Sequence, residues 1–339
     1  NLKLLWVRGR EMAILIKKAE STKEINDSLK LRYLVLEESK KNVSKIFSST
    51  KKVSDFFDVY PDTINMIAYD MGKPIATLRA VPYEDPEKTG AEFSKDEIDL
   101  LNLIFDYSES FNQMKGVAYF IDIVAISQDY SLNDLLIKSI FKGLLNILAT
   151  KKIDTVFFNA SKQFEDHIKE IGFRELASKF NSPSLGKDIT PSFLDIRLYY
   201  DNFIGKIKDR EILRFQETFY FIVYEAGEIC MSQGEKGATA LLVESGELEV
   251  LIFKDDNVIP VKSIQEGHLV GEIGLVTNEQ RTASAMARKQ TACVAFDREF
   301  FLGVMRQQPN KMVDMFKIFS KRIRSTNEEL ARLKKGQSE

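Results

Sequence analysis

Short apolar runs separated by glycine fill residues 219–296 and limit the folds open to this part of the chain. Each run is too short for an ordinary helix, and a turn-forming glycine follows within a few residues. These glycines stand at positions 227, 234, 237, 246, 267, 271 and 274. Regularly spaced short strands and turns are typical of a small antiparallel barrel or jelly roll, so we predict one here.

The first two hundred residues follow another pattern, in which strand and helix signals alternate. Residues 13–19 and 116–126 have the apolar, β-branched composition of buried strands. Residues 21–38 open with Ser21 three positions before Glu24, the spacing of a helix capping box. Further expected elements are a hairpin at 63–81, helices at 94–107 and 132–150, a short helix ending at Gly172, and strands at 155–160 and 193–200. The alternation predicts an α/β layered domain, and hence an α+β chain of two domains.

Composition excludes several classes of function. A formal net charge of −2 gives no electrostatic case for binding nucleic acid or an acidic membrane. His167 and His268 are the only histidines, which excludes a histidine-rich centre, and no metal is predicted. Cys230 and Cys293 lie far apart without a CxxC motif, which favours buried apolar roles in a reducing compartment.

Sequence signals for a membrane or for secretion are absent. The longest apolar stretch, at 135–149, contains two lysines and is too short to span a bilayer. No secretory signal is evident, and Met12 could be the natural start. We therefore expect a cytoplasmic protein.

Two charged side chains interrupt the apolar segment LVGEIGLVTNEQRTASA at 269–285. Burying a charge costs several kcal/mol unless it finds a partner. A helical turn at GEIGL would direct backbone N–H groups outward, and Arg281 would add a guanidinium fork that matches phosphate oxygens. Glu272 would accept hydrogen bonds from a sugar hydroxyl. The spacing indicates a pocket for a nucleotide with one phosphate, although an internal Glu–Arg ion pair explains the same two residues.

A longer stretch supports the nucleotide interpretation. YEAGEICMSQGEKGATALLVESGELEV at 224–250, followed by IQEGHLVGEIGLVTNEQRTASA, resembles the cyclic nucleotide-binding domain, and GEIGL with RTA matches its phosphate-binding cassette. The resemblance implies cAMP or cGMP as effector, with Glu272 on the ribose 2′-hydroxyl and Arg281 on the cyclic phosphate. Ala238 stands where an acidic residue is frequent, a minor departure. The implied binding residues are Gly271, Glu272, Ile273, Arg281, Thr282 and Ala283.

The order of elements in the first half resembles the GNAT acyltransferase fold. FNASKQFEDHIKEIGF at 158–173 looks like that family's segment ending in Gly-Phe. LRYLVLEE, followed by DFFDVYPDTINMIAYDMGKPIATLRAV, resembles the branch of acyl-homoserine-lactone and N-acyl-amino-acid synthases. In that branch an LRY arginine, an acidic FD pair and a TxR hairpin end recur. These positions are Arg32, Asp55, Asp58 and Arg79 here.

This resemblance implies an acyl donor, acyl-CoA or acyl-carrier protein, and an amine acceptor. The acceptor would be bound by Arg32 and Arg79, for which surface or ion-pair roles are the alternative. The donor would lie near Ile126, Leu132, Asn133, Asp134 and Asn159. Two positions depart from the family: SQDYSLND at 127–134 has no glycine where the pyrophosphate loop is glycine-rich, and Ile168 stands where a general-acid tyrosine is frequent.

Acyl transfer to an amine also needs a base that takes the amine proton. The candidates are Asp58, Asp122 and Tyr200, with Glu97 as a further one. Asp122 stands out because it interrupts an otherwise apolar strand, where burial would raise the pKa of its carboxyl. The alternative for Asp122 is an ordinary ion pair, for example with Lys115.

The expected organisation is a GNAT-like domain at 12–204, a helical linker at 205–218 and a cyclic nucleotide-binding domain at 219–339. A terminal helix has apolar positions at a/d heptad spacing, which predicts lid contacts or a homodimer. These positions are Phe316, Phe319, Ile323, Leu330 and Leu333. The predicted function is a cyclic-nucleotide-regulated N-acyltransferase. The alternative is a non-enzymatic sensor whose degenerate GNAT scaffold binds a ligand or partner.

Overall fold

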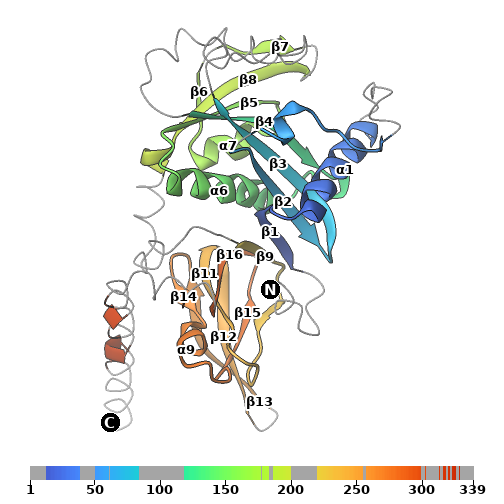
Figure 1. Cartoon of the computed structure of the whole chain (residues 1–339). Coiled ribbons are helices and arrows are strands. Elements are labelled where there is room, and N and C mark those ends of the chain that lie inside the picture. The colour runs from blue at the N-terminus through green and yellow to red at the C-terminus, as the bar shows by residue number, and fades with distance from the viewer. Residues whose placement is uncertain are drawn as a thin grey trace. The chain divides into compact units, whose positions relative to one another are not determined.

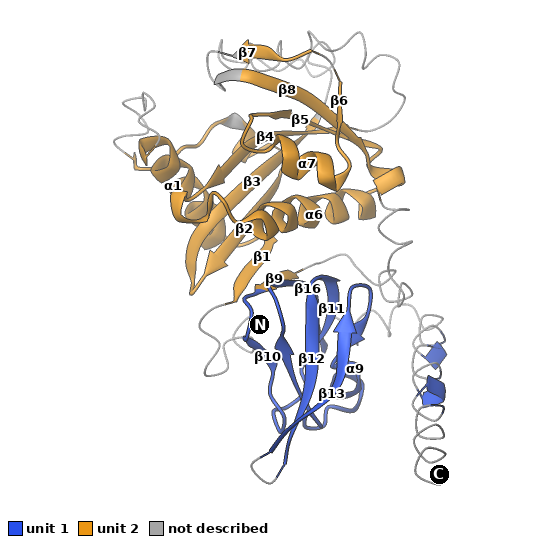
Figure 2. Cartoon of the chain, turned by 180° about the vertical axis from the view of Figure 1, so that it is seen from behind, with its two compact units in different colours: residues 1–10, 203–217, 224–339 blue, residues 11–202, 218–223 orange. Residues whose placement is uncertain are grey.

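A computed structural model gives the arrangement of most of the chain. It describes residues 13–38, 50–60, 62–83, 118–176, 178–182, 186–199, 220–254, 257–298 and single positions from 302 to 328. The predicted helix at 94–107 and the helical linker at 205–218 lie outside these residues, as do Glu97 and Tyr200. The chain divides into two compact units (Figures 1 and 2), one of residues 11–202 and 218–223 and the other of residues 1–10, 203–217 and 224–339.

The first unit is built on a mixed sheet with the strand order β9-β1-β2-β3-β4-β5-β8-β6. The strands are β1 (Ile14–Lys18), β2 (Ile64–Asp70), β3 (Lys73–Tyr83), β4 (Ala118–Ile126), β5 (Thr155–Ala160), β6 (Arg174–Glu175), β8 (Gly186–Asp195) and β9 (Tyr220–Tyr224), with β7 (Phe180–Ser182) on β8. Only β4 and β5 run parallel among these pairs. A parallel pair needs a crossover, which α6 (Asp134–Thr150) supplies.

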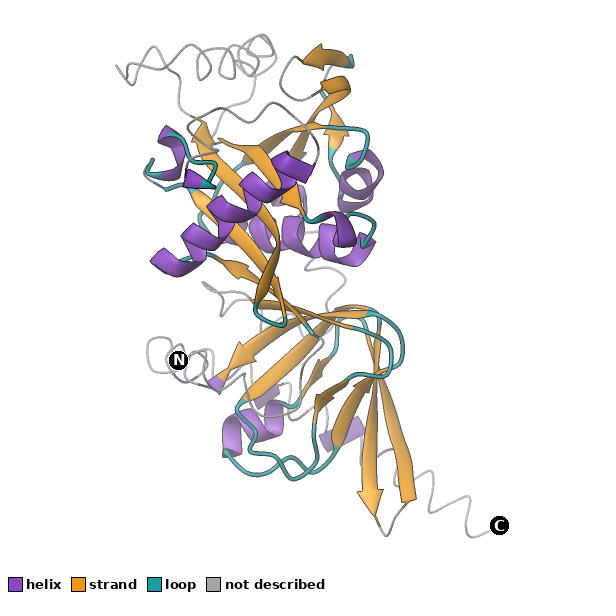
Figure 3. Cartoon of the chain, turned by 90° about the vertical axis from the view of Figure 1, so that its right-hand side faces the viewer, coloured by secondary structure: helices purple, strands orange, loops and turns teal. Residues whose placement is uncertain are grey.

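Helices cover both faces of this sheet (Figure 3). Helix α1 (Thr22–Glu38) covers the face on which Asn65 of β2 accepts a hydrogen bond from Arg32. The next residue, Met66, faces the opposite side of the sheet and packs against α6 at Gly143, where a Cβ would lie 2.9 Å from Met66 Cε. Helix α7 (Glu165–Ile171) packs beside α6. Burial on both faces explains why β2 and β4 are apolar without alternation.

Local signals placed most of these elements correctly. The capping box of α1 is confirmed, since the Ser21 N–H donates to Glu24 Oε2 at 3.0 Å and the Glu24 N–H to Ser21 Oγ at 3.3 Å. Gly172 ends α7 with a φ of 118°, as predicted. The strand predicted at 193–200 is wrong in its bounds, because β8 ends at Asp195 and residues 196–199 are helical. The Asp195 carboxylate accepts the Leu198 N–H at 3.0 Å and so caps this helical turn.

The start of α1 should make stability depend on acidic pH. Partial burial acts to raise the pKa of Glu24, but Lys17 and the N–H groups of Ser21 and Glu20 lower it to about 2. A depressed carboxyl pKa stabilises the fold above the unfolded-state value, and this contribution is lost as the pH falls toward 2. Glu24→Gln should therefore unfold at a lower urea concentration than wild type at pH 7. The gap between the two urea midpoints should shrink as the pH falls from 4.5 to 2. A gap at pH 2 as large as the gap at pH 7 would contradict this.

The second unit is an antiparallel jelly roll, as predicted. One layer contains β14, β11 and β16, and the other has the order β10-β15-β12-β13. Its elements are β10 (Ile229–Met231), β11 (Thr239–Ser245), β12 (Glu247–Lys254), β13 (Asn257–Gln265), β14 (Leu269–Val270), α9 (Glu272–Thr277), β15 (Ser284–Ala287) and β16 (Thr291–Asp297). Cys230 and Cys293 are both fully buried thiols, in agreement with the expected apolar roles.

Two further findings concern the surface of the molecule. Phe316 and Ile323 of the terminal helix are 61% and 62% exposed, while Phe319, Leu330 and Leu333 lie outside the described residues. The homodimer through this helix stays a prediction. In the described part of the chain, no helix combines the length and the apolar character needed to cross a membrane.

Candidate functional site

The predicted cassette turn is held by close backbone packing. Gly271 precedes α9 with a φ of 83°, a left-handed conformation that favours glycine. A Cβ at Gly237 would lie 2.5 Å from Cα of Gly274, closer than side-chain atoms approach. The Gly237 N–H donates to the Glu279 carbonyl at 3.0 Å. These contacts fix the start of α9 against the loop that leads into β11.

Arg281 crosses from this turn to β11. Its Nη1 donates to the Gly271 carbonyl at 2.7 Å, and its Nη2 donates to the Thr239 carbonyl and contacts Thr239 Oγ1 at 3.3 Å. Arg281 is 9% exposed and Glu272, in the first turn of α9, is 4% exposed. The structure thus buries both predicted charged residues at one turn, with the guanidinium oriented by neutral backbone oxygens.

The surface beside Arg281 is hollowed. A depression of about 670 Å³ is lined by Lys236, Asn278, Glu279, Gln280, Arg281 and Thr282. Small-molecule sites have volumes of about 300–1,000 Å³. Of the other predicted residues, Ile273 is 56% exposed and Ala283 half-buried. The sequence analysis missed Thr239, whose carbonyl orients the arginine, because a backbone contact leaves no residue-type signal.

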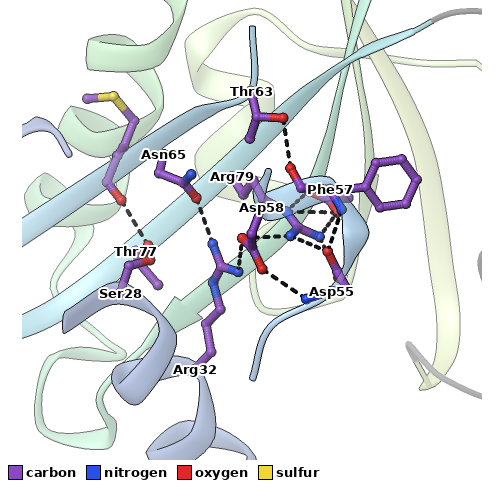
Figure 4. Close-up of polar contacts among 11 residues, drawn as sticks. Ser28, Arg32, Asp55, Phe57, Asp58, Thr63, Asn65, Thr77 and Arg79 are labelled. Atoms are coloured by element: carbon purple, nitrogen blue, oxygen red, sulfur yellow. Dashed lines mark hydrogen bonds and ion pairs between the residues drawn. The ribbon is translucent and has the colours of Figure 1, made fainter. Parts of the chain in front are cut away.

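A second polar cluster lies in the first unit, on the α1 face of the sheet (Figure 4). Its centre is Arg79 of β3, which is fully buried. Arg79 Nε contacts both carboxylate oxygens of Asp122 at 3.1 Å, Nη1 contacts Asp55 at 2.6 Å and Asp58 at 2.8 Å, and Nη2 contacts Asp55 at 2.8 Å and Asp122. All five N–H groups of this guanidinium are therefore used. In this arrangement Arg79 has no donor left for the acceptor that it was predicted to bind.

Arg32 joins the same cluster from α1. Its Nη1 donates to Asp58 at 2.7 Å and its Nη2 to Asn65 at 2.6 Å. Its Nε is buried and has no hydrogen-bond partner among the described residues. Burial acts to raise the pKa of Asp58, but Arg32 and Arg79 lower it below its ordinary value. Both arginines thus form ion pairs, which was the alternative to binding an acceptor.

Asp122 marks the place where the sheet opens. The pairing of β4 with β5 ends at Ile121 and Phe158, although β4 continues to Ile126. On its other side the register with β3 shifts between Arg79 and Ala80, which leaves Asp122 as the extra residue of a β-bulge. Burial raises the pKa of the Asp122 carboxyl more than Arg79 lowers it, in the direction predicted. Its ion-pair partner is Arg79, where Lys115 was the expected one.

The residues expected near a donor lie in two places. Asn133 caps α6 by accepting the Leu136 N–H at 2.9 Å, and Leu132 beside it is 93% exposed. Asp134 contacts Lys138 at 2.8 Å and His167 Nδ1 at 2.7 Å, and these partners lower its pKa although partial burial acts to raise it. At the start of α6, the Asn133 side chain thus already accepts one of the first backbone N–H groups, and Asp134 places a carboxylate there.

The other two donor residues lie near the sheet opening. Ile126 is buried at the end of β4. Asn159 follows the last residue of β5 that pairs with β4. It is 9% exposed, and its Nδ2 has no hydrogen-bond partner among the described residues. The structure therefore brings Arg32, Arg79, Asp58 and Asp122 together. The sequence analysis missed Asn65, although a lone polar residue in an apolar strand was the signal that identified Asp122.

Comparisons with known proteins concern the second unit. The family model described as "Cyclic nucleotide-binding domain" matches residues 221–308. A cGMP-dependent protein kinase of Plasmodium berghei is 29% identical over 31% of this chain and 12% of the kinase. A cAMP-dependent protein kinase regulatory subunit of Aspergillus fumigatus is 32% identical over 29% of this chain and 23% of that protein. The chain spans less than a quarter of the length of either relative.

Solved structures match over a similar share of the chain. The catabolite activator protein of Thermus thermophilus is 28% identical, with a TM-score of 0.32, over 34% of this chain and 55% of that one. A cyclic nucleotide-binding domain from Methylobacillus flagellatus is 18% identical, with a TM-score of 0.33, over 38% of this chain and 78% of that one. The family match and the cassette geometry together identify residues 221–308 as a cyclic nucleotide-binding domain.

Proposed function

We propose that this chain is a GNAT-type N-acyltransferase regulated by cAMP or cGMP bound at Glu272 and Arg281. The observation that carries the acyltransferase half is the opening between β4 and β5 at the bulged residue Asp122, with the ion cluster beside it. The domain bounds proposed with it are 12–204, 205–218 and 219–339, and a homodimer through the terminal helix belongs to the same proposal.

The topology of the first unit supports this proposal. Its strand order from β1 to β6, with one parallel pair at β4 and β5 and a helix crossing between them, agrees with the element order that suggested the GNAT fold. Residues 122–124 of β4 are partly exposed although the Asp122 side chain is 1% exposed, so the accessible atoms include backbone. An extended, amide-bearing donor can form hydrogen bonds with such an unpaired strand edge.

The chemistry needs a base near the opening. Attack of an amine nitrogen on the acyl thioester forms the C–N bond, breaks the C–S bond and releases the thiol, while the amine proton passes to a base. Asp122 is the candidate, because it lies at the opening and burial raises the pKa of its carboxyl. Asp58 has a lowered pKa and is the weaker proton acceptor.

The start of α6, where the resemblance places the donor pyrophosphate, is not built to bind a phosphate group. The Asp134 carboxylate occupies the first turn of α6, and the Asn133 side chain already caps that helix. A donor phosphate would meet negative charge there, so acyl-CoA and acyl-carrier protein are both retained as donors, without a pyrophosphate contact at α6.

One observation favours a second function. Ile168, at the position of the frequent general-acid tyrosine, is 2% exposed and belongs to the core. The start of α6, which is capped by Asn133 and carries the Asp134 carboxylate, is also unsuited to a donor phosphate. Together these features support a non-enzymatic sensor whose first unit binds a ligand or partner.

Thiol release distinguishes the two functions. The full chain is incubated with acyl-CoA or acyl-carrier protein and a panel of primary amines, with and without each cyclic nucleotide, and free thiol is followed. We expect turnover that the nucleotide changes by about 5-fold or more, since allosteric coupling is typically about 1–3 kcal/mol. Tight nucleotide binding without thiol release from any donor would support the sensor and contradict the enzyme.

A further inference from the structure

We infer that Met231 positions the guanidinium of Arg281 and thereby contributes to nucleotide affinity, although it lies far from the cassette in the sequence. This role rests on the proposed binding of cAMP or cGMP at Arg281, because it concerns how that side chain is held. Met231 is a positioning residue, which acts on the guanidinium and not on the ligand.

The Met231 side chain lies against the cassette turn at Gly271. A Cβ at Gly271 would be 2.6 Å from Met231 Cε and 2.7 Å from Met231 Sδ. The same point would be 2.7 Å from Arg281 Nη1. The thioether and the guanidinium therefore lie next to each other, in the space that a side chain at Gly271 would fill. Met231 is 2% exposed and Arg281 is 9% exposed, so this place is shielded from water.

One short segment holds Arg281 at both ends. At the backbone, the Arg281 N–H donates to the Glu235 carbonyl at 2.7 Å, and the Arg281 carbonyl accepts from the Gly234 N–H at 2.8 Å. At the far end of the side chain, the neighbour is Met231, the last residue of β10. Residues 231–235 thus determine both where this arginine leaves the backbone and where its guanidinium lies.

The hydrogen bonds of the guanidinium do not fix it by themselves. Nη1 donates to the Gly271 carbonyl at 2.7 Å, and Nη2 donates to the Thr239 carbonyl. The side chain could still rotate if the space beside Nη1 were empty, and an apolar side chain packed there removes the alternative positions. Methionine suits this place, because it is unbranched and has no strong acceptor that would compete with the Gly271 carbonyl for Nη1.

Shortening Met231 should therefore weaken nucleotide binding. Groups that bind a ligand must be held within about 0.5 Å of their productive geometry. Met231→Val fits a strand but lacks the atoms that reach Gly271, and it should weaken cAMP or cGMP binding by about tenfold. Met231→Leu keeps a similar apolar volume and should bind within about threefold of wild type. Calorimetric titration of the full chain measures both.

The same substitution in an Arg281→Lys background separates positioning from a general effect on the fold. Lysine has no guanidinium for Met231 to position. Met231→Val should therefore change the affinity of Arg281→Lys by less than about twofold, since residues that act through one another are not additive. Equal losses in the two backgrounds would overturn the inference.

The matched control is Leu248→Ala. Leu248 is fully buried in β12, where it pairs with Ile264 and Ala287. This variant should lower the urea midpoint at least as much as Met231→Val, because it leaves a cavity in the core. Its nucleotide affinity should equal that of wild type. A similar loss of affinity in both variants would show that any weakening of the jelly roll impairs binding, which contradicts a positioning role.

A measurement without ligand tests the contact itself. In NMR spectra of the full chain with isotope-labelled methionine methyl groups, the Met231 signal is the one that Met231→Leu removes. Arg281→Lys should shift this signal and leave that of Met66, which packs against α6 in the first unit, in place. An unshifted Met231 signal would overturn the inference, even if Met231→Val fails to fold.

The outcomes for the proposed function are distinct. Nucleotide binding that Arg281→Ala abolishes and Met231→Val leaves unchanged would retain the nucleotide site and reject the role of Met231. A wild-type chain that binds neither nucleotide would reject the proposed site, and with it any effect of Met231 on affinity, whatever the methyl signal shows.

Discussion

Replacing Arg79 with methionine should lower the free energy of unfolding by about 3–5 kcal/mol. Arg79 is fully buried and contacts Asp55, Asp58 and Asp122. Methionine has a similar apolar length, so the lost term is mainly electrostatic. Asp122 would be left buried without its guanidinium partner. Taking up a proton is then the least costly way to avoid a buried, unpaired negative charge, and protonation is easier at low pH. We therefore expect the loss in urea unfolding to be larger at pH 8 than at pH 5.

An exposed arginine is the matched control for this variant. Arg197 is 78% exposed and pairs with Asp154. Exposed ion pairs contribute about 0–1 kcal/mol, so Arg197→Met should change stability by no more than that. Equal effects of the two substitutions would contradict a central role for the cluster.

A double variant identifies the origin of the loss. Removing Asp122 together with Arg79, as Arg79→Met with Asp122→Leu, should recover part of the stability, because apolar residues can replace a buried ion pair at little cost. If the double variant is less stable than Arg79→Met alone, Asp122 contributes through packing or backbone geometry at the β-bulge and not through its charge.

The cassette could be predicted from sequence because its residues are close together in the chain. Gly271, Glu272 and Arg281 lie within eleven positions. The required backbone conformation also selects the residue type, since Gly271 adopts a φ of 83°. The capping box of α1 and the terminal glycine of α7 were predictable for the same reason, that a local conformation and a residue type imply each other.

The ion cluster could be predicted only as a set of residues. Arg32, Asp55, Asp58, Arg79 and Asp122 come from two helical segments, a loop and two strands, and the sequence does not give their mutual distances. The sequence could not show that Arg79 has every donor engaged, because that depends on the register of β3 with β4 and on the bulge at Asp122. The sign of the charge that remains accessible, at Asp55, follows from burial alone.

The largest effect on binding is expected for Arg281→Ala, which should weaken cAMP or cGMP binding by about 30-fold or more. Removing one partner of a desolvated charge pair costs about 2–5 kcal/mol, and each 1.4 kcal/mol is tenfold in affinity. Arg281 is 9% exposed, so its guanidinium is itself largely desolvated. Calorimetric titration of the full chain measures the loss directly.

Arg281→Lys separates charge from geometry. Lysine keeps the charge but lacks the guanidinium fork that donates to the Gly271 and Thr239 carbonyls. We expect intermediate affinity and an unfolding midpoint close to that of wild type. Wild-type affinity in Arg281→Lys would show that the fork is not used.

The remaining alternative is that Glu272 and Arg281 serve each other and bind no nucleotide. The 2′-deoxy form of the nucleotide decides this, because it lacks the hydroxyl that Glu272 is proposed to accept from. Glu272→Gln should lower affinity for the ribo form and leave that for the 2′-deoxy form nearly unchanged, whereas Arg281→Ala should lower both. If Glu272→Gln lowers the affinity for both nucleotides equally, Glu272 acts by holding the cassette in place. Loss of a direct contact with the 2′-hydroxyl could not lower the affinity for a nucleotide that lacks this hydroxyl.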